Sequence, residues 1–234
     1  STCEIDAKAG TVLCMELVKA LQKILLNIST DDEGYGYFGE KTLAACPTMQ
    51  TGMATTERNK KLVTLFCHAM FCKGYSTTAI YDSFNANVAN GVKKIQADMG
   101  MPQTGVVTPL LMKAVFNTDS YVLSSKGDAR IREIQQAMNN GYSEYSGINP
   151  CDGIYSRATN KALIYAIQKE EGISVENSAP SFGQTTFSLF PTLPFTGDSK
   201  ETGKNEANIT KILQYALYVN AMYAGDFDGV YSAT

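Results

Sequence analysis

Short stretches with apolar residues at helical spacing recur along the chain, separated by polar segments that carry glycine. The clearest set lies between Asp128 and Pro191. Residues 129–138 and 161–169 each place apolar side chains at intervals of three and four residues, and a shorter apolar stretch follows at 181–191. This spacing predicts amphipathic helices. Because such short helices are not stable alone, we expect the three to bury their apolar faces against one another.

Two turns that carry glycine are predicted between these helices. The first lies at Asn140-Gly-Tyr142 and leads to a loop from Cys151 to Thr159, and the second is Glu171-Gly-Ile173. The loop contains an Asp-Gly pair, Asp152-Gly153. Such a pair suits a tight turn, because glycine accepts a positive φ and the carboxylate binds backbone amides. We expect a serine or threonine of the loop to cap the next helix.

The same order of elements recurs earlier in the chain. Residues 59–117 contain an apolar helix, a turn at Gly74-Tyr75, a second helix over Asn87 to Met99, and a third helix opened by Pro109. Proline is well tolerated in a first helical turn. The loop of this copy differs, since Tyr81-Asp82 stands where Asp-Gly is expected. We therefore predict no specific role for that loop.

Two further segments match only parts of the pattern. Residues 1–49 contain a helix over Val12 to Leu26 and end in Phe-Gly-x-x-Thr and Pro-Thr, the signature that also closes the central copy. Residues 207–234 supply a first helix and an Asp-Gly loop. The predicted fold class is therefore all-α, with tandem three-helix modules joined by polar linkers. The full repeats are predicted at 59–117 and 127–192, and the partial repeats at 1–49 and 207–234.

Taken together, these motifs resemble the peptidoglycan-binding repeat of bacterial cell-wall hydrolases, a three-helix module. The matching positions are Gly141-Tyr142, Asp152-Gly153, Tyr155, Thr159, Ile167-Gln168, Gly172-Ile173 and Phe182-Gly183, and in the last segment Leu213-Gln214, Asp228-Gly229 and Tyr231. The resemblance implies a non-catalytic region that binds peptidoglycan and brings an attached cell-wall hydrolase to its substrate. It also implies an extracellular or bacterial cell-wall location. The alternative is a structural or assembly module that uses its repeats for protein-protein contacts.

Two interpretations of the Asp-Gly loops stay open at this point. In the first, the loops only turn the chain. In the second, they wall a shallow groove where sugar rings stack on tyrosine and muropeptide amides form hydrogen bonds. The ligand-binding candidates are then Asp152, Gly153, Tyr155, Thr159, Tyr142, Asp228 and Tyr231. We expect four helical glutamines to form hydrogen bonds to the loops rather than to a ligand: Gln22, Gln96, Gln168 and Gln214.

Composition narrows the range of partners. Charged residues make up 18% of the chain and the net charge is -3, so no broad basic surface is available for a phosphate backbone, and we expect no nucleic acid partner. No apolar run reaches the about 20 residues that span a bilayer, so we expect no membrane insertion. The six cysteines show no metal-binding spacing, and we expect neither a metal nor a cofactor. Buried free thiols are favoured over disulfides, for which Cys3 and Cys14 form the best local pair.

No catalytic constellation is recognised, so we predict no enzyme activity within this chain. His68 is the only histidine, and we expect it to be partly buried on an apolar helix, with Cys67 on another face. A Cys-His pair of His68 with Cys151 or Cys46 stays open. The loop aspartates recur once per repeat, whereas a glycosidase needs one asymmetric pair in one cleft. We expect Glu170-Glu171 at the end of a helix to be solvated.

The two partial repeats suggest one further hypothesis. Residues 207–234 of one chain and residues 1–49 of another would together complete one repeat, which predicts head-to-tail self-association. Such a contact is heterologous, and it either propagates or closes into a ring. The competing interpretation is that the sequence is a fragment of a longer polypeptide.

Overall fold

The computed structural model describes residues 7–29, 34–75, 79–193, 206–223 and 225–230. The chain divides into two compact units, and the boundary after Ser120 falls between the full repeats predicted at 59–117 and 127–192. All regular elements in the described ranges are helices. The prediction of an all-α fold is therefore confirmed, while the predicted boundaries of the repeats stay a prediction.

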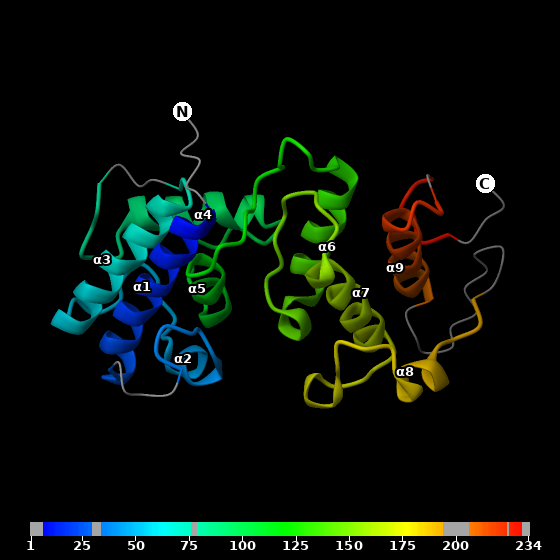
Figure 1. Ribbon diagram of the computed structural model, residues 1–234, viewed down its shortest axis with the longest axis horizontal. Coiled ribbons are helices and arrows are strands. Elements are labelled where there is room, and N and C mark those ends of the chain that lie inside the picture. The colour runs from blue at the N-terminus through cyan, green and yellow to red at the C-terminus, as the bar shows by residue number, and fades with distance from the viewer. Residues whose placement is uncertain (1–6, 30–33, 76–78, 194–205, 224, 231–234) are drawn as a thin grey trace. The chain divides into compact units, whose positions relative to one another are not determined.

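Unit 1 contains five helices in its described residues, which Figure 1 shows in blue to green. They are α1 (Ala7–Leu26), α2 (Glu40–Ala45), α3 (Glu57–Cys72), α4 (Ala86–Asp98) and α5 (Pro109–Val115). α1 packs against α2 and α3, and α5 packs against the same two helices. α1 ends where the sequence predicts, because Asn27 takes a left-handed conformation with φ 55°. Thr108 accepts a hydrogen bond from the Leu111 amide and so caps α5 ahead of Pro109.

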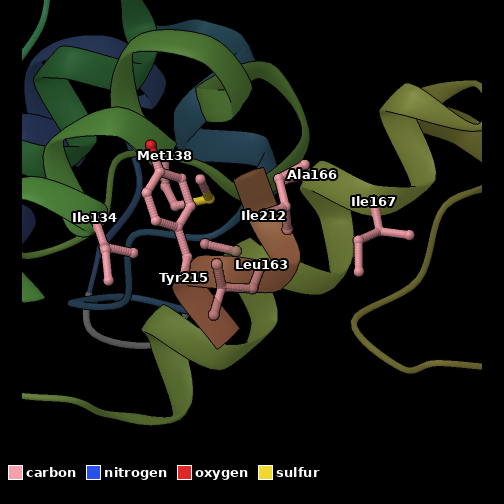
Figure 2. Close-up of a cluster of buried hydrophobic side chains, with 8 residues drawn as sticks. Ile134, Met138, Leu163, Ala166, Ile167, Ile212 and Tyr215 are labelled. Atoms are coloured by element: carbon pink, nitrogen blue, oxygen red, sulfur yellow. The ribbon is translucent and has the colours of Figure 1, made fainter. Parts of the chain in front are cut away.

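Unit 2 contains the remaining described helices. They are α6 (Ala129–Ser146), α7 (Arg157–Glu170), the 3-10 helix η1 (Val175–Asn177), α8 (Gln184–Leu189) and α9 (Glu206–Val219). α7 packs against both α6 and α9. A buried apolar cluster joins the three helices, and Figure 2 shows side chains from each of them in it. Its buried members are Ile134, Met138, Ala162, Leu163, Ala166, Ile167, Ile212 and Tyr215.

The last helix belongs to this core, although the sequence assigns it to a separate partial repeat. Ile209, Ile212 and Tyr215 of α9 are buried within unit 2. Burying an apolar side chain of this size contributes about 1.5–3 kcal/mol to stability. The apolar face of α9 therefore already has a partner in the same chain. Head-to-tail self-association through the terminal segments stays a prediction.

Tyrosines in this core make unit 2 sensitive to alkaline pH. Burial raises the pKa of Tyr215 from 10.0 to about 12. Because the folded pKa exceeds the unfolded one, the stabilising contribution of neutral Tyr215 is fully present below pH 10.0 and is lost as pH rises toward about 12. We expect the free energy of unfolding of the Tyr215→Phe variant to fall less steeply with pH across that window. Urea unfolding followed by circular dichroism at several pH values measures this. If the variant's free energy of unfolding fell with pH as steeply as that of the unaltered chain, the burial of Tyr215 would not be the cause of the alkaline sensitivity.

The turn predicted at Gly141-Tyr142 is wrong. α6 continues through both residues and ends only at Gly147, which takes φ 74°. Contacts from α7 support the extra turns of helix: the Lys169 ammonium donates to the Gly141 carbonyl at 2.8 Å, and the Tyr142 hydroxyl donates to Glu170 at 2.8 Å. These partners lie 28 residues away in the chain, so local turn signals could not reveal them.

The two copies of the Phe-Gly-x-x-Thr signature adopt the same backbone geometry. Gly39 precedes α2 with φ -89° and ψ -170°, and Gly183 precedes α8 with φ -89° and ψ -176°. The threonine of each signature, Thr42 or Thr186, is buried and accepts a hydrogen bond from a helical glutamine amide. The sequence match between these segments therefore reflects matched structure.

The described cysteines are free thiols, as the sequence analysis favoured. Cys46, Cys67 and Cys151 are buried. Burial raises the pKa of Cys46 to about 12, so its thiolate form is disfavoured at neutral pH. Cys3 lies outside the described residues, and so does the Cys3–Cys14 pair.

Candidate functional site

The loop between α6 and α7, here called the Asp152 loop, is held from inside by one glutamine of α6. Gln135 is fully buried, with an exposed fraction of 0%. Its amide nitrogen donates to the Ile154 carbonyl at 3.0 Å, and to Asp152 Oδ1 and Thr159 Oγ1 at 3.3 Å each. Its amide oxygen accepts from the Gly153 amide at 2.9 Å. The amide nitrogen and the amide oxygen of this side chain are therefore both directed at the loop and at the first turn of α7.

Gly153 brings the loop against the first turn of α6. It takes φ +77°, and a Cβ atom there would lie 2.6 Å from the Asp128 carbonyl oxygen and 2.9 Å from its nitrogen. The Asp128 amide donates to the Gly153 carbonyl at 2.9 Å. Across the same contact, a Cβ on Gly127 would lie 2.2 Å from the Asp152 carbonyl oxygen. Only glycine fits at these two positions.

The remaining contacts of the loop confirm the predicted turn chemistry. Asp152 Oδ1 accepts from the Ile154 amide at 2.9 Å, and Ser156 caps α7 by accepting from the Thr159 amide. Among the described residues, no hydrogen bond reaches the other carboxylate oxygen of Asp152. Ile154 and Tyr155 are exposed, and the Tyr155 hydroxyl donates to Asn160. These two side chains are the exposed ones of the loop, and the half-buried Asp152 lies beside them in the sequence.

The same arrangement, here called the glutamine clamp, recurs at other loops. In each case the amide oxygen accepts from a loop N–H, and the amide nitrogen donates to a nearby loop carbonyl. The clamps join Gln22 to Gly36 and Tyr37, Gln96 to Gly105 and Val106, Gln168 to Ala179 and Ser181, and Gln214 to Gly229 and Val230. Gln168 uses the Ala179 amide, because the following Pro180 has no N–H. The prediction that these four glutamines bond internally is confirmed.

Gln135 completes the set, and the sequence analysis missed it. The signal was present: each clamp glutamine directly follows leucine or isoleucine, and Ile134-Gln135 has the same form as Leu213-Gln214. The apolar residue faces the core, and the glutamine beside it is carried into the buried region where the loop backbone needs partners.

A second Asp-Gly loop follows α9. The Gln214 amide donates to Asp228 Oδ1 at 2.8 Å, and this bond, together with the Val230 amide, lowers the pKa of Asp228. A Cβ on Gly229 would lie 2.7 Å from the Ala207 carbonyl oxygen at the start of α9. This close contact is equivalent to the one between Gly153 and Asp128. Tyr231, the other ligand-binding candidate of this loop, lies outside the described residues.

The structure brings together only some of the predicted site residues. Asp152, Gly153 and Thr159 meet at Gln135, and Thr159 is buried there. Tyr155 lies at the exposed edge of the same loop. Tyr142 is not part of this group, since its ring packs against the core cluster and its hydroxyl donates to Glu170. Burial, followed by that hydrogen bond, raises the pKa of Tyr142.

An arginine that the sequence analysis did not single out connects the second loop to α6. The Arg130 guanidinium lies 4.5 Å from the ring centroid of Tyr218 and 4.2 Å from that of Phe227, and it donates to the Gly225 carbonyl. Stacking of this kind contributes about 0.5–2 kcal/mol. The Tyr218 hydroxyl also donates to Asp128 Oδ2 at 2.9 Å. Both Asp-Gly loops therefore contact the first turn of α6, within unit 2.

The groups considered for catalysis are differently placed. His68 is exposed, so the expectation of partial burial is wrong: α3 turns its apolar face inward and His68 outward. Cys67 is buried on another face of the helix, as expected. Cys46 is buried in unit 1 and donates to the Thr42 carbonyl.

The acidic pair at the end of α7 is not uniformly solvated. Glu171 is buried, which corrects the expectation for that residue. Glu170 accepts from Tyr142 and from Asn208 of α9 at 3.2 Å. Both residues lie where α7 meets its neighbours, so their environment depends on packing that the local sequence does not contain.

The described part of the chain holds no group of three or more His, Cys, Asp and Glu side chains suited to a metal ion. In the same ranges, no helix has the length and hydropathy needed to cross a membrane.

With this geometry in place, comparison with known families gives one match. Residues 124–200 match the family described as FadG/YbfG, PGDB-like domain, where PGDB denotes peptidoglycan-binding-like. This segment resembles a peptidoglycan-binding-like domain. It contains α6, α7 and α8 together with the whole Asp152 loop.

Two curated relatives from Bacillus subtilis (strain 168) are similar to nearly the whole chain. The uncharacterized protein YbfG is 39% identical over 231 residues, which cover 97% of this chain and 30% of the relative. The uncharacterized protein FadG is 37% identical over 235 residues, which cover 99% of this chain and 39% of the relative. The chain thus spans only 30% to 39% of the length of these relatives. No solved structure matches the chain.

Proposed function

We propose that this chain is a non-catalytic region that binds peptidoglycan. The observation that carries the proposal is the match of residues 124–200 to the PGDB-like domain, because the matched segment contains the clamped Asp152 loop. The proposal extends to an extracellular or cell-wall location and to the targeting of an attached cell-wall hydrolase.

The geometry of the loop supports this role. The clamp by Gln135 fixes the loop backbone, so little conformational entropy is lost when a ligand binds. The exposed Tyr155 ring offers a face for a sugar ring, and the outer carboxylate oxygen of Asp152 offers an acceptor for a muropeptide amide. The Asp228 loop offers a second acceptor beside exposed Val230. Two weak sites on one polymer increase the overall affinity through avidity.

Binding to purified peptidoglycan sacculi tests the proposal. We expect Tyr155→Ser to weaken binding in a pull-down about tenfold, since loss of aromatic contact of about 1.4 kcal/mol corresponds to that factor. Phe71→Ser is the matched control, because Phe71 is also an exposed aromatic residue, at 63%, but lies on α3 outside any Asp-Gly loop. The control is expected to bind as the unaltered chain does.

Three outcomes would count against the proposal. The first is binding of the unaltered chain no stronger than to a control polysaccharide. The second is equal weakening by Tyr155→Ser and Phe71→Ser, which would indicate nonspecific adsorption. The third is clearing of a cell-wall gel by the unaltered chain in zymography, which would contradict the non-catalytic part.

The alternative function, a module for protein-protein contacts, is favoured by a different observation. Phe182, just before α8, and Phe187 on α8 are both exposed, the latter with an exposed fraction of 69%. Exposed aromatic side chains are typical of protein interfaces.

A further inference from the structure

The packing around α2 in unit 1 shows what covers the Phe-Gly-x-x-Thr signature. Phe38 packs its ring against Phe116 at the end of α5, with centroids 6.4 Å apart, and only 7% of Phe38 is exposed. Just beyond α2, Met49 pairs with Val107 through two backbone hydrogen bonds of 2.9 Å. The third helix of one predicted repeat is thus covered by the third helix of the next and by the segment that leads into it.

The matching segment of unit 2 is more exposed among the described residues, where the Phe182 ring packs only on Phe190, with centroids 6.1 Å apart. Phe182 corresponds to Phe38 and Leu193 to Met49, because Phe-Gly-x-x-Thr and Pro-Thr stand at the same spacing in both. Phe182 is 47% exposed, and Leu193 is only half-buried, whereas Met49 is fully buried. Within the described ranges, the pairing of Met49 with Val107 is the one isolated β-bridge, so Leu193 has no counterpart of it there.

Two features of the surrounding helices match in the two units. α1 packs against α3 in unit 1, and α7 packs against α9 in unit 2. The helices α1 and α7 each carry the glutamine that binds the threonine of the following signature, Gln22 to Thr42 and Gln168 to Thr186. When α1, α2 and α3 are aligned with α7, α8 and α9, no described element of unit 2 aligns with α4 or α5.

We propose that the surface formed by the exposed Phe182 and the half-buried Leu193 is a docking surface for the third helix of a further repeat. The partner has the chemistry of α5 and the residues beside it. It carries an extended valine whose N–H and C=O pair with Leu193, a Thr-Pro helix start, and an aromatic residue at the helix end that packs on Phe182. This contact is between protein segments and does not depend on peptidoglycan binding.

An extended chain tests this proposal. The Asp228 loop aligns with the Asp152 loop, and Asn85 caps α4 where Ser156 caps α7, so a copy of residues 88–117 continues the pattern after Thr234. We expect this extension to slow hydrogen exchange at the Leu193 amide at least tenfold relative to the unextended chain. The helical signal in circular dichroism is also expected to be larger in the extended chain than in the unextended chain.

Two variants control for the contact. Replacing the copy of Phe116 by serine in the extension, or Phe182→Ser in the extended chain, is expected to restore fast exchange at Leu193. Phe182→Ser in the unextended chain is expected to leave that rate unchanged within twofold.

Two results would overturn the proposal. One is an extension that adds no helical signal or leaves Leu193 exchange unchanged, because so short a helical segment folds only by packing. The other is protection of Leu193 in the unextended chain that rises with protein concentration, which would make a second copy of the chain the partner.

Discussion

Gly153→Ala is expected to lower the free energy of unfolding of unit 2 by about 3–5 kcal/mol. A non-glycine residue at φ +77° costs about 1–2 kcal/mol by itself. The added Cβ would also lie 2.6 Å from the Asp128 carbonyl oxygen, so the loop must move away from the start of α6. Urea unfolding followed by far-ultraviolet circular dichroism measures the loss.

Gly172→Ala is the matched control for this result. Gly172 has a nearly identical φ of +79°, but nothing lies within 4 Å of the position its Cβ would take. Gly172→Ala is expected to lower the free energy of unfolding only by the cost of a non-glycine residue at positive φ, about 1–2 kcal/mol. Equal losses at the two positions would show that the close contact between the loop and α6 contributes nothing to stability.

Gln135→Leu is expected to destabilise unit 2 by a similar amount, about 3–5 kcal/mol. The substitution keeps a side chain of similar size but removes its amide group. The Gly153 amide and the Ile154 carbonyl are then left without their hydrogen-bond partner. Each buried polar group that loses its hydrogen bond costs about 1–3 kcal/mol. Urea unfolding measures the change, and the loss of protection at the Gly153 amide in hydrogen exchange locates it.

The control here is Gln184→Leu. Gln184 is exposed at the start of α8, and among the described residues its side chain bonds only to Ser188, at 3.3 Å. This variant is expected to change stability by less than about 0.5 kcal/mol. A Gln135→Leu variant that is as stable as the control would show that the clamp does not hold the loop.

Much of the architecture could be predicted because it depends on short-range patterns. Apolar periodicity placed the helices, and the predicted end of α1 at Asn27 is where the helix stops. Asp152-Gly153 was recognised as a turn because its chemistry is local. The glutamines were assigned an internal role because an amide next to core residues must find partners within the fold.

The features that the sequence analysis missed depend on contacts between distant segments. Arg130 bonds to Gly225, 95 residues away, and nothing in the local sequence marks that partner. Gly141 remains helical because Lys169 binds its carbonyl. Burial of Glu171 follows from its place at the end of α7 in the packed unit rather than from its neighbours in sequence.

The glutamine clamp also bears on how such repeats diverge. It binds the backbone of the loop, and the residue whose carbonyl it holds is tyrosine, valine, isoleucine, serine or valine at positions 37, 106, 154, 181 and 230. The clamp therefore leaves the identity of that side chain unconstrained. A substitution at one of these positions therefore changes the side chain that the loop presents, while the clamp on the loop backbone stays the same.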